Sequence, residues 1–200
     1  MASITCPDCG QPTSDQSRAC PSCGAALDAP VRFKCPNLEA ALRAVLKKPE
    51  DAITREDLAS LGDFKSDEGL TDLTGLEHAN NLTKLNVRNN RITDVRPLAN
   101  LTGLVLLDLF HNQITDLAPL VKLTRLTELH LGKNRITDVA PLAGLTSLTK
   151  LGLIANHITD VSPLAGLASL TSLYLPEIAD DQKRMLEESL PNCEIHIIPA

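Results

Sequence analysis

Aromatic residues and clusters of like charge are both scarce in this sequence. It has no Trp, one Tyr and three Phe, so aromatic side chains make up 2% of its 200 residues. The net charge is −6, and only residues 82–175 carry a small positive excess, +3. A nucleic-acid-binding surface needs clustered Lys and Arg, so the sequence argues against a nucleic-acid partner. No apolar run approaches the ~20 residues that span a bilayer, and we expect no membrane partner.

Catalytic fingerprints are absent as well. The sequence has no GxSxG, P-loop, HExxH or dinucleotide-binding glycine pattern, and we expect no enzymatic activity. The N-terminal residues lack the apolar stretch of a secretory signal, which predicts a cytoplasmic protein. In that setting the six cysteines are expected to be reduced thiols or metal ligands rather than disulfides.

The dominant feature that is present is a repeat of 22 residues. Asn recurs at one column of the repeat, and Asp and Pro recur at two others. Seven apolar columns, followed through four units from Leu82 to Leu167, hold only Leu, Ile or Val at all 28 positions. The Asn column consists of Asn90, Asn112, Asn134 and Asn156.

The repeat predicts a stack of short parallel strands. Leu85 and Val87 alternate with polar residues, which is strand periodicity, and successive strands should lie ~4.8 Å apart. We expect the Asn amides to form an internal ladder by bonding the backbone of the next coil. Asp94 and its equivalents should accept backbone N–H groups at the start of the convex arm. One unit cannot bury its own apolar face, so stacking must do so.

The pattern LxxLxLxxNxITDLxPLxxL resembles the 22-residue class of leucine-rich repeats found in internalins. The resemblance implies an α/β solenoid with a parallel β-sheet on its concave face. It also implies a helical N-terminal cap and a C-terminal cap made of a helix and a strand. We assign residues 66–176 to the repeats, 37–65 to the N-terminal cap and 177–200 to the C-terminal cap.

The N-terminal cap is expected to contain two helices. Asn37 is positioned to N-cap a helix over about 38–48. Thr54 and Asp57 form a capping-box-like start of a second, short helix. Glu68 occupies the position where the Asn column would continue. Terminal units of a repeat array often depart from the repeat pattern in this way.

The C-terminal cap begins where Ile178 replaces the repeated Asn. A helix is expected to start at Asp180 or Asp181. The sequence of residues 190–198 predicts a final strand. We expect Cys193 to be a buried residue of the cap.

Two CxxC pairs precede the repeats, separated by ten residues. Their four thiolates match the tetrahedral, sulfur-rich site that zinc prefers. The ligands would be Cys6, Cys9, Cys20 and Cys23. The segment resembles the short zinc ribbons at the N-termini of many prokaryotic proteins, so we assign a ribbon to residues 1–27 and a linker to 28–36.

One zinc ion is expected, and its role is structural because four Cys ligands leave no open coordination position. The segment has too few apolar residues to fold on a core, so metal binding would supply its folding energy. A pair of disulfides or a disordered thiol tail is the alternative. Cys35 lacks a partner CxxC and is expected not to be a ligand.

The outward positions of the strands form the candidate binding surface. Phe110, Ile154 and Tyr174 are large apolar residues at positions expected to face water, with Gly132 and Gly152 leaving room for a shallow pocket between them. The predicted partner-binding residues are Arg88, Asp108, Phe110, His130, Ile154 and Tyr174.

Asp108 and His130 are adjacent in one column, and Glu128 is close by. This arrangement admits an acid–base or metal pair, but a surface contact on an open face is the interpretation we favour.

These features predict a non-enzymatic protein–protein interaction module. The concave face would bind an unidentified protein, with the zinc ribbon as a tether or second contact, and we expect a monomer. The alternative is a nucleic-acid-binding or regulatory zinc-ribbon protein that uses the repeats as a scaffold. Residues 1–28 contain one basic residue, Arg18, and no aromatic residue, which disfavours nucleic-acid binding.

Overall fold

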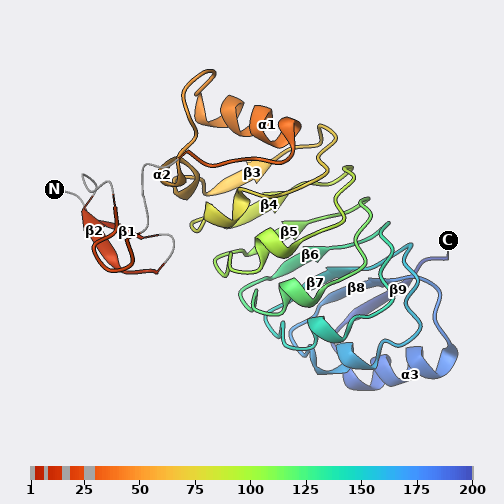
Figure 1. Ribbon diagram of the computed structural model, residues 1–200. Coiled ribbons are helices and arrows are strands. Elements are labelled where there is room, and N and C mark those ends of the chain that lie inside the picture. The colour runs from red at the N-terminus through yellow and green to blue at the C-terminus, as the bar shows by residue number, and fades with distance from the viewer. Residues whose placement is uncertain (1–2, 7–8, 15–18, 25–29, 200) are drawn as a thin grey trace.

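The protein folds as a leucine-rich repeat solenoid, as predicted. The computed structural model describes residues 3–6, 9–14, 19–24 and 30–199. Seven parallel strands lie side by side in chain order, as Figure 1 shows. They are β3 (Asp63–Lys65), β4 (Lys84–Asn86), β5 (Leu106–Asp108), β6 (Glu128–His130), β7 (Lys150–Gly152), β8 (Ser172–Leu175) and β9 (Glu194–Ile197).

The strands pair in a register that keeps each repeat column aligned. Leu85 pairs with Leu107, and Leu107 pairs with Leu129. Leu85, Leu107 and Leu129, at the centres of β4, β5 and β6, are fully buried, because alternate strand residues point to opposite faces. The flanking residues of each strand therefore form the concave surface.

Short 3-10 helices form the convex side and close each coil. Asp94 accepts the N–H of Arg96 at 2.9 Å, and Asp116 accepts that of Ala118 at 2.8 Å. This confirms the predicted role of the Asp column at the start of the convex arm. The 3-10 helices are Leu76–His78, Arg96–Leu98, Ala118–Leu120, Ala140–Leu142 and Ser162–Gly166.

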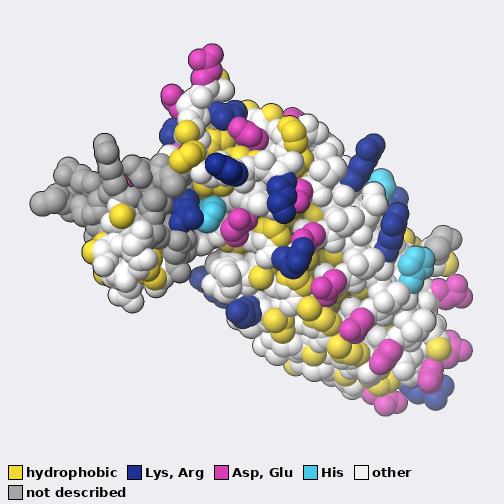
Figure 2. All heavy atoms as spheres, viewed as in Figure 1, with side chains coloured by type: hydrophobic (Ala, Val, Ile, Leu, Met, Phe, Trp, Pro, Cys, Tyr) yellow, Lys and Arg dark blue, Asp and Glu magenta, His cyan; other side chains and the backbone are white. Residues whose placement is uncertain are grey.

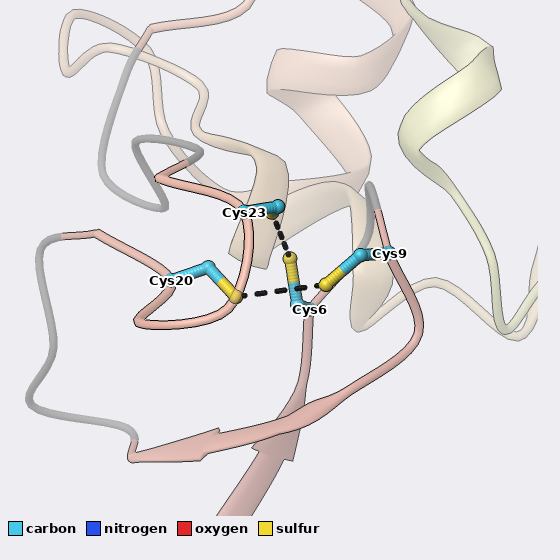
Figure 3. A group of neighbouring side chains, drawn as sticks. All are labelled: Cys6, Cys9, Cys20 and Cys23. Atoms are coloured by element: carbon cyan, nitrogen blue, oxygen red, sulfur yellow. Dashed lines mark hydrogen bonds between the residues drawn. The ribbon is translucent and has the colours of Figure 1, made fainter.

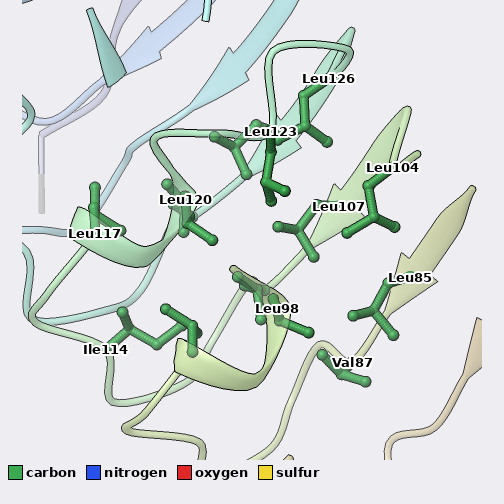
Figure 4. Close-up of a cluster of buried hydrophobic side chains, with 14 of the residues drawn as sticks. Leu85, Val87, Leu98, Leu104, Leu107, Ile114, Leu117, Leu120, Leu123 and Leu126 are labelled. Atoms are coloured by element: carbon green, nitrogen blue, oxygen red, sulfur yellow. The ribbon is translucent and has the colours of Figure 1, made fainter. Parts of the chain in front are cut away.

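Leucine fills the space between the sheet and the convex turns. Figure 4 shows side chains from two neighbouring coils, such as Leu85 and Leu107, meeting in this layer. Phe64 is the only aromatic residue among the buried side chains of the described residues. Aliphatic packing that repeats from coil to coil therefore replaces an aromatic core, and each coil stabilises its neighbours.

The Asn side chains bond backbone groups of the preceding coil. Asn112 accepts the N–H of Ile92 at 3.0 Å and donates to the carbonyl of Val87 at 3.0 Å. The expectation that they would reach the next coil was wrong in direction. Each Asn lies just after its strand, where the chain leaves the sheet. The backbone groups within reach of its amide there belong to the preceding coil, as Ile92 and Val87 do for Asn112.

The N-terminal cap contains α1 (Pro36–Leu46) and α2 (Arg55–Ala59). Thr54 and Asp57 form the predicted capping box. The prediction that Asn37 is an N-cap was wrong, because Pro36 already occupies the first turn and Cys35 is the N-cap. The Asn37 amide instead donates to the carbonyls of Glu68 at 2.7 Å and Gly69 at 3.3 Å, and so ties α1 to the first coil.

The predicted linker 28–36 is not free along its whole length. Residues 25–29 lie outside the described residues, but the N–H of Val31 donates to Ile53 at 2.8 Å. Phe33 packs against Gly75, and Cys35 lies in the hydrophobic core. The cap therefore begins before residue 37.

The C-terminal cap consists of α3 (Asp180–Ser189) followed by β9. Gln182 accepts the N–H of Val161 at 2.9 Å, which joins α3 to the last convex turn. Cys193 is half-buried rather than buried as predicted, because it lies in the turn between α3 and β9, at the edge of the core.

In the N-terminal segment, β1 (Ser3–Thr5) pairs antiparallel with β2 (Pro12–Ser14).

Acidic and basic side chains are interspersed on the face of the molecule seen in Figure 2, and Asp and Glu gather near α3. None of the helices in the described parts of the chain has the length and apolar character needed to cross a membrane.

Candidate functional site

The four N-terminal cysteines form a compact group. All four sulfur atoms lie within 4.8 Å of one another, and Figure 3 shows them converging from two turns. The Sγ atoms of Cys6 and Cys23 are 3.7 Å apart, and those of Cys9 and Cys20 are 3.6 Å apart. Four sulfurs at ~2.3 Å from a tetrahedral ion would be about 3.8 Å from one another. Two of the sulfur–sulfur distances are therefore close to those of a tetrahedral four-sulfur metal site.

Local backbone geometry explains why the two CxxC pairs place their sulfurs alike. The N–H of Gly10 donates to the Cys6 carbonyl at 2.9 Å, and the N–H of Gly24 donates to the Cys20 carbonyl at 2.8 Å. Both glycines have positive φ, 72° and 73°, a conformation that side-chain-bearing residues rarely adopt. The glycine after each pair thus closes a turn around the first cysteine.

The thiols of the group are shifted in opposite directions: the pKa of Cys9 is raised, since the lowering by the Gln11 backbone is outweighed by burial and the Cys6 and Cys20 thiols, but that of Cys20 is lowered. Burial raises the pKa of the Cys20 thiol, but the backbone N–H groups of Cys23 and Ser22, together with Cys6 and Cys9, lower it to about 6. Metal ligands must be deprotonated, so the environment of Cys20 suits metal binding. Cys35 is buried at the start of α1 and is not part of the group.

The concave face contains an open hollow of about 320 Å³, lined by Arg88, Asp108, Phe110 and His130. These are four of the six residues predicted to bind a partner. They come from the ends of three neighbouring strands, β4, β5 and β6, and the register of the sheet brings them together.

Phe110 and Ile154 are half-buried, so they are less exposed than expected for residues that face water. Both lie over Gly132, where an added Cβ would be 2.9 Å from Ile154 Cγ1 and 3.0 Å from Phe110 Cδ2. The space left by Gly132 is therefore filled by its neighbours and is not a pocket. Together the three residues form an apolar floor beside the hollow.

Two cations flank the Phe110 ring. Arg88 Cζ and Lys133 Nζ are each 5.6 Å from the ring centroid, within the ~6 Å range of cation–π attraction. Lys133 was not among the predicted partner-binding residues because it belongs to the turn after β6, one residue beyond the outward strand positions.

Asp108 and His130 do not form the predicted surface contact on an open face. Asp108 is only 8% exposed, and its Oδ1 accepts the N–H of Phe110 at 3.0 Å. His130 Nε2 lies 3.8 Å from Glu128 Oε2, and Glu128 also pairs with Lys150 at 3.2 Å. Asp108 therefore orients the strand end that carries Phe110, and the carboxylate beside His130 is that of Glu128.

Tyr174 lies apart from the hollow, on β8. It is 37% exposed, and its ring stacks on His196 with centroids 4.6 Å apart and an angle of 16° between the planes. His196 was missed because residues 190–198 were assigned to the cap. It stands 22 residues after Tyr174, so extending the column by one period would have found it.

Comparison with known proteins agrees with this architecture. Residues 80–122, 102–144 and 124–166 match the family Leucine Rich repeats (2 copies). No curated protein gives a significant match. The chain therefore has the fold of a leucine-rich repeat solenoid, and its repeats are similar to those of this family.

The structural similarity is to part of larger internalins. The crystal structure of the internalin InlF from Listeria monocytogenes str. 4b F2365 is 29% identical, with a TM-score of 0.68 over 86% of this chain and 58% of that one. The functional domain of InlJ from Listeria monocytogenes, which includes a cysteine ladder, is 27% identical, with a TM-score of 0.58 over 82% of this chain and 42% of that one. This chain thus spans less than two thirds of either relative.

Proposed function

We propose that this protein is a non-enzymatic interaction module that binds a protein partner through its concave face. The observation that carries the proposal is the hollow in which Phe110 lies between Arg88 and Lys133, beside the apolar contact of Ile154 with Gly132. Aromatic and Arg side chains around a depression are the residue types that dominate binding energy in protein interfaces. Repeat solenoids present such extended concave surfaces to partners.

The N-terminal cysteine group supplies a second, structural element of the proposal. Cys6, Cys9, Cys20 and Cys23 would hold one zinc ion, which would stabilise the fold of residues 1–27. A shell of four thiolates is closed, so this ion has no position for a substrate. Thiolate ligands require reduced cysteines, and we propose a cytoplasmic setting on that ground.

The concave site is tested by capturing a partner from a lysate of the source organism and measuring its affinity for purified variants. Phe110→Ala and Tyr174→Ala should weaken binding by about tenfold or more, with little change in the melting temperature. Arg96→Ala is the matched control, because Arg96 is exposed on the convex side and pairs only with Asp94 among the described residues.

A chain lacking residues 1–27 completes the experiment. Retained affinity in this chain, with loss in the concave variants, supports the proposal. Intact affinity in both concave variants, with loss in the truncated chain or in Arg96→Ala, would move recognition to the cysteine unit or to the convex side.

A further inference from the structure

Arg88 lines the concave hollow, and further cations that form no ion pair among the described residues follow the neighbouring strands. Arg88 and Arg91 follow β4, and Lys133 and Arg135 follow β6; all four are exposed. We call these four residues the basic rim. The ion pairs formed among the described residues involve other cations.

The acidic side chains of the same coils are already engaged. Asp94 pairs with Arg96 at 2.7 Å, and Glu128 pairs with Lys150 at 3.2 Å. Asp108 is bonded to the Phe110 N–H and almost fully buried. The rest of the Asp column accepts backbone N–H groups on the convex arm, through Asp116, Asp138 and Asp160. Hence the rim is not neutralised locally, although the whole chain carries −6.

The positive region is limited to the central coils. The first coil carries Asp67 at the position opposite Arg88, and Glu68 follows it. The last repeat carries Glu177 at the position equivalent to Lys133. These acidic ends would repel an acidic partner there and favour its placement at the centre of the solenoid, over Phe110.

An apolar surface lies directly beside this charge. The Phe110 ring lies 5.6 Å from Arg88 and from Lys133, and it lies over Gly132 together with the side chain of Ile154. A ligand that satisfies the site therefore needs a negative group next to a large apolar side chain.

We propose that the hollow binds an acidic segment of a partner protein, with an Asp or Glu carboxylate between Arg88 and Lys133 and an adjacent apolar side chain on Phe110 and Ile154. The inference rests on the proposed function and specifies the chemistry of its partner. Arg pairs carboxylates in a bidentate manner, and charge complementarity raises the association rate. A basic segment is disfavoured, because Arg88 and Lys133 repel it and Asp108 is too buried to attract it strongly.

The test uses the full chain and a library of random peptides displayed on phage, from which binders are selected and resynthesised. We expect the selected peptides to contain Asp or Glu beside Phe, Leu or Ile, and to bind more weakly as salt screens the charges. The double variant Arg88→Glu/Lys133→Glu should reduce the affinity of these peptides by about tenfold or more.

Lys122→Glu/Arg125→Glu is the matched control. It changes the net charge by the same amount at two exposed residues that precede β6, away from the ends of the strands, and should change affinity by less than about twofold. Melting curves of both double variants establish that the repeats remain folded.

The outcomes separate this inference from the proposed function. Neutral or basic peptides that lose affinity in Phe110→Ala would overturn the acidic chemistry and leave the concave site in place. Equal losses in the two double variants would show nonspecific attraction and overturn it too. Selection of no peptide, or only of peptides insensitive to Phe110→Ala, would contradict both proposals.

Discussion

Removing one amide of the Asn ladder should destabilise the whole solenoid. In Asn112→Ala, the N–H of Ile92 loses its bond to Asn112 Oδ1, and the described residues offer it no other acceptor. The carbonyls of Val87 and Leu109 each lose one donor but keep another, from Asn90 and Asn134 respectively. The expected result is therefore one orphaned buried donor and two lost hydrogen bonds, besides the long 3.5 Å contact of the Asn112 amide with the Phe110 carbonyl.

The magnitude follows from that count. An orphaned buried donor costs about 1–3 kcal/mol and a lost hydrogen bond about 0.5–1.5 kcal/mol, so the free energy of unfolding should fall by about 2–6 kcal/mol. Urea unfolding followed by circular dichroism measures the change, and hydrogen exchange at the Ile92 amide should accelerate. Thr115→Ala, an exposed change in the same coil, should stay within about 0.5 kcal/mol. Equal effects of the two variants would refute a stabilising role for the ladder.

Three further predictions address packing and the metal. Leu129→Ala should lower the free energy of unfolding by about 2–5 kcal/mol because its side chain is fully buried. His130→Ala should change the same free energy by less than about 0.5 kcal/mol. Similar losses in both variants would mean that the inward and outward residues of β6 are wrongly assigned. Ser66→Val should raise the same free energy by about 1 kcal/mol, as urea unfolding would show, because the Ser66 hydroxyl is buried without a partner among the described residues; a loss would imply a bridging water. Metal analysis should find one zinc per chain in the wild type and none in Cys20→Ser, with unchanged melting of the repeats; wild-type protein without metal would contradict the zinc site.

The solenoid could be predicted from the sequence because each repeat column has one physical role. The apolar columns alternate as a strand requires, and a stack is the only arrangement that buries them. The Asp column also bonded the backbone as expected, since the Pro-containing turn that follows is local. Local signals of this kind fix the capping box at Thr54 and Asp57 as well.

Predictions that depended on neighbouring coils were less successful. The partial burial of Phe110 and Ile154 follows from the missing side chain at Gly132, one strand away from each, and not from their own sequence positions. The Asn37 prediction failed because Pro36 starts α1 earlier, which leaves the Asn37 amide to bond the first coil. Side-chain placement on the concave face is thus decided across strands.

Four of the predicted partner-binding residues line one hollow, and this outcome could be predicted from the sequence only in part. Their column positions are visible in the sequence, and the in-register pairing of β4, β5 and β6 brings them together. The flanking role of Lys133 depends on the turn after β6, where Lys133 adopts a positive φ of 54°. The same column has a positive φ in the neighbouring units, at Asn89, His111 and Ala155, but a lysine does not by itself predict that conformation.

Hydroxyl-radical footprinting of the protein with its captured partner tests the concave site most directly. The account predicts that the partner protects Phe110, His130 and Tyr174 from oxidation, because all three lie on the concave face. The exposed Val45 on α1 and Val121 beside the convex turn should stay as reactive as in the free protein. Protection of Val45 or Val121, with unchanged oxidation of the three concave residues, would contradict the account.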